Sequence, residues 1–344
     1  MNGKERFYAT IAGSKEDRPA SWLGIPTNEA LPALLEYFSA ANMLELKRKI
    51  NDDIWAVEVP FHCPPANHIA CAFDFAPTMD YAERTLTTPG WFMDKVEPAC
   101  VKDFSWPDPR RHISQEECRN TIRQCPQDMA LMGVMWSAHF QDACAAFGME
   151  NAMIAMLTEP ELFQAVIDRI VEFYIQANEI FYHAGQGMLD AVLIGNDFGS
   201  QNALMVAPAQ LRQFVFPGTR RLIEQAHSYG YKVIHHSCGA VHEIIADLIE
   251  LGADVIHPIQ ALAAGMEPKG LHEEFGEKVA FCGGVDAQNL LVNGTPEQVR
   301  EKVSELREIF PTGLIISPSH EAILPDIPPA NIKAIFDFLK EVSR

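Results

Sequence analysis

From residue 128 onward, short apolar segments of strand length alternate with longer amphipathic segments. This alternation is typical of parallel strands that are joined by crossover helices. The predicted strands cover residues 128–136, 189–197, 231–238, 253–260, 278–285 and 313–320. Six such units, with room for two more upstream, favour an α/β fold of the (β/α)8 TIM-barrel type over a doubly wound open sheet.

Local signals mark the ends of several of the intervening helices. Thr295 is suited to cap a helix whose first residue is Pro296, because threonine accepts a backbone hydrogen bond and proline needs none there. Gly230 and Gly252 stand where the C-terminal caps of two other helices are expected.

The first third of the chain is less regular. Two helices are predicted there, over residues 29–49 and 86–101, as a helical cap on the barrel or as part of elaborated early barrel loops. Between them, the segment FHCPPANH contains His62, Cys63 and His68, which we interpret as loop residues because the prolines leave no recognisable ligand spacing. We expect one barrel domain over 1–344, with an N-terminal elaboration (1–110) and regular units over 128–344.

Polar or reactive side chains follow the apolar part of most predicted strands. They are Asp197, His236, Cys238, His257, Gln260, Cys282 and His320. The active site of a barrel enzyme is built at the carboxyl ends of its strands. The pattern therefore predicts an enzyme whose site lies at these strand ends.

His236 and Cys238 are separated by one residue at the end of a predicted strand. Side chains at positions i and i+2 of a strand point to the same side, so this imidazole and this thiol can hold one zinc ion. A third ligand must come from another strand end, and both His320 and Cys282 are candidates. The alternative is a buried cysteine beside a hydrogen-bonded core histidine. His235 points to the other side of the strand, and we interpret it as structural.

The segment GNDFGSQN supplies candidates for substrate binding. Asp197 can carry a proton or anchor a substrate, although an aspartate at such a place also caps turns and helices. Gln201 and Asn202 offer further donors and acceptors. The remaining candidates for the lining of a substrate pocket are His257, Gln260 and Cys282.

Charge and composition restrict the possible partners. A net charge of −19 disfavours nucleic acid and anionic membranes as partners. The segment 1–22 lacks the apolar core of a signal peptide, and the eight cysteines then predict free thiols in a cytoplasmic protein. The sequence contains no GxGxxG after a strand, no GxxxxGK[ST], no GxSxG and no HExxH motif, so the usual signatures of dinucleotide, nucleotide and serine-esterase chemistry are missing.

The motifs GNDFGSQN, KVIHHSCGAVHEIIADLIELGADVIHPIQ, KVAFCGGVDAQ and LIISPSHEAILPDIPPANI follow one another over most of the second half. In this order they resemble the uroporphyrinogen decarboxylase-like superfamily, which also contains corrinoid-dependent zinc methyltransferases. Uroporphyrinogen decarboxylases carry an arginine-rich MRQAGRY pattern after Arg-Pro, but here ASWLGIPTNE follows Arg18-Pro19. The methyltransferase branch is the better match, since its zinc ligands include a His-x-Cys pair like His236 and Cys238.

That resemblance also implies a third zinc ligand late in the barrel, a cysteine whose place is taken here by His320. It implies methyl transfer between a small substrate and methylcobalamin on a separate corrinoid-binding protein, because the Asp-x-His-x-x-Gly pattern of cobalamin domains is missing. In this hypothesis the catalytic residues are Asp197, His236 and Cys238. A methyl ether, amine, thiol or tetrahydrofolate would serve as the small methyl donor or acceptor. The alternatives are a decarboxylating lyase, with Asp197 as proton carrier, and a non-catalytic corrinoid-binding module.

Overall fold

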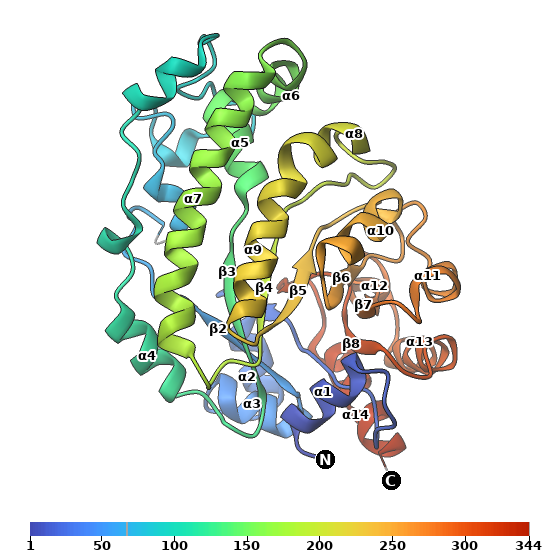
Figure 1. The fold of residues 1–344 in the computed structure, drawn as a ribbon. Coiled ribbons are helices and arrows are strands. Elements are labelled where there is room, and N and C mark those ends of the chain that lie inside the picture. Colours follow the sequence, from blue (N-terminus) through green and yellow to red (C-terminus); the bar gives the residue numbers. More distant parts are fainter. Residues whose placement is uncertain (67, 344) are drawn as a thin grey trace.

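A parallel seven-stranded sheet forms the centre of the protein (Figure 1). The computed structural model describes residues 1–66 and 68–343. The strands follow one another in sequence order, each hydrogen-bonded to the next. They are β2 (Ile54–Glu58), β3 (Ala130–Trp136), β4 (Ala191–Gly195), β5 (Lys232–His236), β6 (Val255–Ile259), β7 (Ala280–Val285) and β8 (Leu314–Pro318). The last six coincide with the six predicted strands, which are therefore confirmed.

Residues 20–22 take the place of an eighth strand. Ser21 forms a parallel bridge with Ile316 of β8, and its carbonyl accepts a hydrogen bond from the Asp53 N–H, 3.2 Å away, next to β2. This short segment therefore spans the gap between the two edge strands. The result is the predicted (β/α)8 TIM barrel with additional N-terminal helices, in which the first strand is reduced to a single bridge. A separate two-stranded ribbon pairs β1 (Ile25–Pro26) with β9 (Ala322–Ile323).

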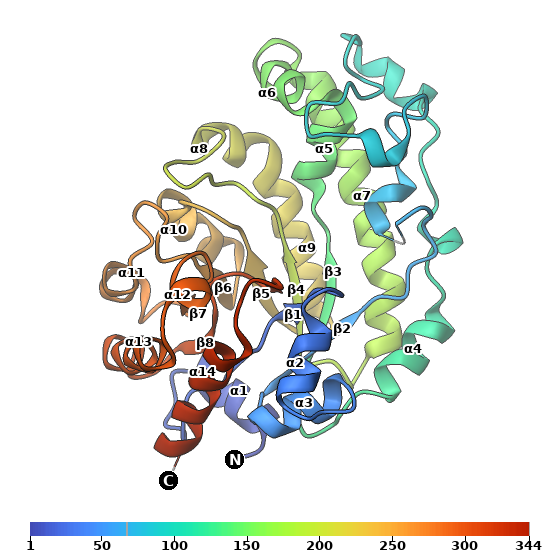
Figure 2. The ribbon, with the colours of Figure 1, turned by 180° about the vertical axis from the view of Figure 1, so that it is seen from behind.

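Helices surround the barrel, and α1 and α14 bring the two chain ends to the same end of the molecule (Figures 1 and 2). The longest helix, α7, has 26 residues. The helices are α1 (Gly3–Ile11), α2 (Leu31–Tyr37), α3 (Met43–Ile50), α4 (Gln115–Arg123), α5 (His139–Phe147), α6 (Met149–Thr158), α7 (Pro160–Gly185), α8 (Pro208–Gln210), α9 (Phe216–Ser228), α10 (His242–Leu251), α11 (Pro268–Phe275), α12 (Leu290–Asn293), α13 (Pro296–Ile309) and α14 (Pro329–Val342). Among the described residues, none of these helices combines the length and apolar composition needed to cross a bilayer.

The predicted helix ends are confirmed. Thr295 caps α13 in a reciprocal arrangement with Gln298, and Pro296 is the first residue of this helix. Gly252 follows α10 in a left-handed conformation, with φ of +106°. Gly230, just beyond the end of α9, has φ of +82°. These are positions at which a glycine relieves the strain that a Cβ atom would cause.

The N-terminal helix predictions need two corrections. The helix expected over residues 29–49 is broken into α2 and α3, because Ser39 takes a positive φ of 50° and Asn42 caps the second helix. No α-helix forms over residues 86–101; turns lead into a short 3-10 helix at Pro98–Asp103. Gly90 lies against the end of α5, where an added Cβ would come within 2.2 Å of the Ala145 carbonyl oxygen. This contact holds the segment as an irregular strap rather than a helix.

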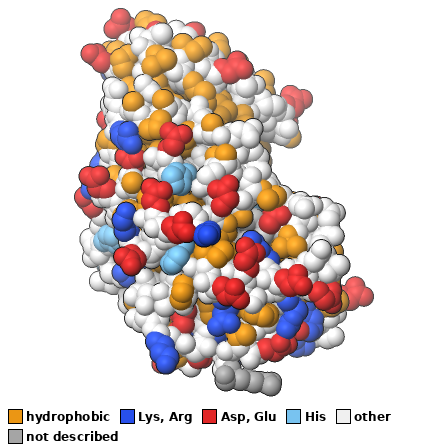
Figure 3. Space-filling view, turned by 90° about the vertical axis from the view of Figure 1, so that its right-hand side faces the viewer, with side chains coloured by type: hydrophobic (Ala, Val, Ile, Leu, Met, Phe, Trp, Pro, Cys, Tyr) orange, Lys and Arg blue, Asp and Glu red, His pale blue; other side chains and the backbone are white. Residues whose placement is uncertain are grey.

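That strap belongs to a lobe that rises above one side of the barrel. Short 3-10 turns at Ile69–Ala72 and Tyr81–Glu83, together with α5 and α6, build this lobe, while a third turn at Pro109–Arg111 packs on α7 just before α4. It stands beside the ends of β3 and β4 in Figure 2. A space-filling view shows hydrophobic side chains gathered in the upper part of the visible face and charged ones crowded lower down (Figure 3). Of the two interpretations of the N-terminal third, a helical cap or elaborated early barrel loops, the second describes this lobe.

Strand alternation decides which side chains enter the barrel. Ile234 belongs to the buried cluster inside the barrel, and His236, two residues on, points the same way toward the mouth. His235 points outward and stacks on Phe198, with ring centroids 6.2 Å apart. Its predicted structural place is confirmed.

Candidate metal and substrate site

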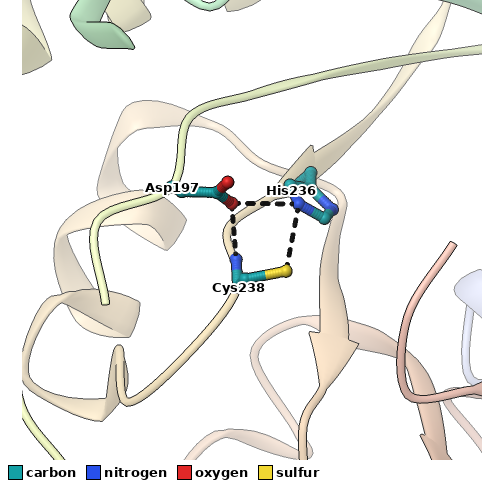
Figure 4. A group of neighbouring side chains, drawn as sticks. All are labelled: Asp197, His236 and Cys238. Atoms are coloured by element: carbon teal, nitrogen blue, oxygen red, sulfur yellow. Dashed lines mark hydrogen bonds and ion pairs between the residues drawn. The ribbon is translucent and has the colours of Figure 1, made fainter. Parts of the chain in front are cut away.

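Three predicted site residues meet just beyond the ends of β4 and β5 (Figure 4). The Asp197 Oδ1 atom lies 3.2 Å from His236 Nε2 and accepts a hydrogen bond of 3.1 Å from the Cys238 backbone N–H. The Cys238 sulfur lies 3.5 Å from the same imidazole nitrogen. The i, i+2 spacing thus brings imidazole and thiol together, as the sequence predicted.

The three groups shift one another's protonation. Burial by itself would raise the pKa of Asp197, but the hydrogen bond and charge of His236, with the Cys238 N–H, lower it to about 2. Burial opposes a charge on His236, yet Asp197, Cys238 and Glu321 raise its pKa to about 10. Burial also opposes ionisation of the Cys238 thiol, but hydrogen bonds from His236 and His320 lower its pKa. The site therefore favours a carboxylate, an imidazolium and a thiolate side by side.

Three sets of side chains have donor atoms within 4.8 Å of one another among the described residues. They are Asp197, His236 and Cys238; His236, His257 and Glu321; and Cys238, His320 and Glu321. The trio predicted from sequence, His236, Cys238 and His320, is split between two sets that share the cysteine. His320 is linked to the thiol, and this contact is the first cause of the raised pKa of His320.

Glu321 was not predicted from the sequence, but it belongs to two of these sets. Its Oε2 atom is buried and has no hydrogen-bond partner among the described residues; it lies 3.7 Å from His236 Nδ1 and 3.6 Å from His320 Nδ1. A buried carboxylate oxygen without a donor is unfavourable, and a bound cation would satisfy it. Imidazole, thiolate and carboxylate are the ligands that Zn²⁺ accepts in proteins. The residues present therefore fit a zinc ion.

His257 lies beneath this site in the barrel interior. Its Nδ1 atom is 2.9 Å from Nδ1 of His236, so one ring donates and the other accepts. Burial, followed by the charges of His236 and His320, keeps the pKa of His257 well below its usual value. A neutral His257 can therefore fix the orientation of His236 from behind. The structure places it in contact with a candidate metal ligand rather than in the wall of the open cavity.

The other predicted substrate residues lie to one side. Gln260 accepts a hydrogen bond of 2.8 Å from the Gly239 N–H, and its amide donates to Gln201 at 2.5 Å. These bonds tie the loop after β5 to the loop after β4. Asn202 is exposed on the latter loop. None of the three borders the cavity at Asp197 and His236 in the described part of the chain.

Cys282 does not join the site. Its side chain is fully buried in the apolar cluster inside the barrel, and burial raises the pKa of its thiol. The described residues include no metal-ligand set that contains it. Of the two candidates for a third ligand, only His320 has a donor atom close to Cys238.

The cavity next to the site has a volume of about 290 Å³. Its wall includes Asp197, His236 and Glu321, and also side chains that the sequence did not single out: Trp136, Gln141, Asp142 and Asn196, with His68 from the N-terminal loop. No Lys or Arg contributes to this wall among the residues described. The cavity is therefore poorly suited to a substrate with many carboxylates.

Trp136 has an unusual place in this wall. Its φ is +65°, a left-handed conformation that is strained for a bulky residue, and Ser137 follows with φ of +54°. The indole meets the His236 ring edge to face, with centroids 5.3 Å apart. Its position at the carboxyl end of a predicted strand is the sequence signal that could have identified it.

Comparison with known proteins gives the family. The model of the uroporphyrinogen decarboxylase (URO-D) family matches residues 91–342, and the chain belongs to this enzyme family. A uroporphyrinogen decarboxylase of Chlorobaculum parvum is 23% identical over 199 residues, covering 56% of this chain and 53% of the relative. A methylated-thiol–coenzyme M methyltransferase of Methanosarcina mazei is 23% identical over 212 residues, covering 59% and 53%.

The chain thus spans about half the length of these curated relatives. A solved structure of a methyltransferase from Methanosarcina mazei superposes with a TM-score of 0.71 at 18% identity, covering 99% of both chains. This likeness shows the fold. The family therefore includes relatives with decarboxylase names and relatives with a methyltransferase name, and the residues of the site have to distinguish between them.

Proposed function

We propose that this protein is a zinc-dependent methyltransferase that moves a methyl group between a small substrate and a separate corrinoid protein. The observation that carries the proposal is the meeting of His236 and Cys238 at the barrel mouth. Beside them lies a Glu321 oxygen that has no hydrogen-bond partner among the described residues. The methyltransferase among the relatives supports the same choice.

In this proposal His236, Cys238 and His320 hold the zinc ion, and Glu321, whose carboxylate lies within 4.8 Å of the donor atoms of Cys238 and His320, could contribute an oxygen. Bound zinc would lower the pKa of a substrate thiol or hydroxyl, or polarise the oxygen of a methyl ether. The methyl donor or acceptor is a methyl ether, amine, thiol or tetrahydrofolate, and the corrinoid arrives on a partner protein.

The chain's own residues position the substrate. Asp197 has a lowered pKa and is ionised at neutral pH, so its free carboxylate oxygen can accept a hydrogen bond from the substrate and orient it. Trp136 covers one side of His236 and limits the access of water. His257 holds the His236 ring from below through the Nδ1 contact.

A uroporphyrinogen decarboxylase-like lyase is the alternative, and the names of several relatives favour it. Asp197 would then carry the proton that replaces the departing carboxylate. A tetrapyrrole with several carboxylates calls for cationic groups in the wall, but the described lining offers none. This observation places the lyase second.

The test is the zinc content of the protein purified without added metal. About one zinc ion per chain is expected in the wild type, with strong loss in Cys238→Ala and His320→Ala. Cys282→Ala is the matched control, because this thiol is buried away from the site, and its zinc content should equal that of the wild type. Zinc retained in Cys238→Ala but lost in Cys282→Ala would reverse the ligand assignment. A wild type that binds no zinc even after reconstitution under reducing conditions would refute the proposal and favour the lyase.

A further inference from the structure

A second cavity adjoins the site cavity beneath the N-terminal lobe. It has a volume of about 290 Å³, and Phe75, Tyr81 and Arg84 contribute to its wall. Two residues, Ala70 and Asp142, belong to the walls of both cavities. The two spaces are therefore neighbours that border the same two residues. Together they reach the size of ordinary small-molecule sites, ~300–1,000 Å³.

Asp142 is the polar group at the junction. It lies on α5, its exposed fraction is 6%, and the Tyr174 hydroxyl donates a hydrogen bond of 2.5 Å to its Oδ2 atom. Within the described residues no partner is found for Oδ1, and this atom is not among the fully buried ones. Burial raises the pKa of this carboxyl to about 7, although the Tyr174 hydrogen bond opposes the shift. The proposed zinc chemistry does not use this group.

The rest of the second wall is mainly apolar, and its one cation is already paired. Arg84 donates to Asp74 at 2.7 Å and lies over the ring of Tyr81, 5.6 Å from its centroid. Phe75 is buried and stacks on Phe104. An anionic ligand would therefore lie close to the Asp142 carboxyl, and no free cation among the described residues of this wall would offset the repulsion. The cavity thus disfavours anions.

We propose that the two neighbouring cavities act as one site and bind an extended, mainly apolar methyl donor or acceptor that places a hydroxyl or amine group at Asp142 and carries no carboxylate. The inference rests on the proposed function and deepens it. The reacting end lies at Asp197 and His236, and the tail lies between Phe75 and Tyr81. One-carbon compounds such as methanol leave most of this space empty and bind weakly.

The test is calorimetric titration of the zinc-loaded protein with three probes: 3-methoxybenzyl alcohol, 3-methoxybenzoate and methanol. The alcohol is expected to bind with a dissociation constant of millimolar or tighter, and at least about tenfold more tightly than either other probe. Asp142→Ala should weaken binding of the alcohol about tenfold, as the loss of one hydrogen bond implies. Asp142→Asn keeps a hydrogen-bonding group, so this variant should bind the alcohol more tightly than Asp142→Ala and less tightly than the wild type.

Ala70→Leu fills the junction and should abolish binding of the alcohol, whereas Ala203→Leu on the exposed loop after β4 is the matched control and should not. Equal binding of benzoate and alcohol, tight methanol binding, or indifference to both the Asp142 and Ala70 variants would overturn the inference. No binding of the alcohol by zinc-loaded wild type would overturn it as well. Zinc content is measured on the same samples, so failure of the metal site is recognised separately from failure of the cavity.

Discussion

Residues 20–22, which stand in for the first strand of the barrel, are held in place by the buried carboxylate of Asp53. The substitution Asp53→Asn tests this. Asp53 is 1% exposed and accepts hydrogen bonds from Arg6 (2.6 Å), Arg18 (2.6 and 3.1 Å) and the backbone N–H of Ser21 (2.8 Å). Arg18 is itself 4% exposed, and Asp53 is its only salt-bridge partner among the described residues. The substitution keeps the shape of the side chain but removes its charge.

Removing one partner of a buried ion pair costs about 3–5 kcal/mol, because the other charge stays buried without compensation. The unfolding entropy of a folded chain is about 2.1 cal/mol/K per residue. For 344 residues, dividing the lost free energy of unfolding by this entropy gives a fall in melting temperature of about 4–7 °C. Calorimetry at neutral pH measures the fall directly.

The control is Asp128→Asn, on the same end of the barrel. Asp128 is 60% exposed and 3.9 Å from Arg48, so its loss should change stability by less than about 0.5 kcal/mol. If Asp53→Asn unfolds within about 1 °C of the wild type, the carboxylate does not hold this segment. The closure of the barrel would then have to rest on the backbone hydrogen bonds that residues 20–22 form with Ile316 and Asp53.

Three further predictions concern the site. In protein freed of metal with a chelator, Asp197→Asn should lower the free energy of unfolding at pH 6. In urea titrations the difference from wild type should shrink as the pH falls from ~4 toward 2, because the depressed pKa of about 2 means that folding stabilises the charged form. A difference independent of pH would contradict this. Asp142→Asn should become more stable relative to wild type as the pH rises from ~4 to ~7, by roughly 4 kcal/mol at most. The reason is that folding raises the pKa of this carboxyl to about 7, so the wild type loses stability as the carboxyl ionises. Thermal unfolding at pH 5 and pH 8 measures this, and a larger advantage of the variant is expected at pH 8. Gly195→Ala should lower the free energy of unfolding by ~1–3 kcal/mol and reduce the zinc content, because the new Cβ would lie 2.1 Å from the His236 carbonyl oxygen. Gly270→Ala is the control and should be tolerated, because no atom lies within 4 Å of the added Cβ.

Much of the barrel could be predicted from the chain alone because its signals are local. The apolar segments from residue 128 onward predicted six strands in their observed places. The same local geometry predicted that His236 and Cys238 point to one side, since a strand repeats every two residues. Position at a strand end also identified Asp197 and His320 as residues of the barrel mouth.

The N-terminal third could not be predicted in the same way. Residues 86–101 contain enough apolar residues to suggest a helix, but Gly90 packs on the backbone at the end of α5, and this contact with a distant segment decides the conformation. Residues 20–22 act as a strand only because β8 and the residue before β2 offer hydrogen bonds on either side. Their own sequence carries no strand pattern of sufficient length.

The sequence by itself determined the fold class, the strand ends and the pairing of imidazole with thiol, because each depends on periodicity within a short segment. Only the tertiary structure decided which loops surround that pair. It placed Glu321 rather than Cys282 beside Cys238, and it brought Asp142 and Trp136 into the cavity wall. These contacts join segments far apart in the chain, and they form only when the barrel closes and the N-terminal lobe packs beside its mouth.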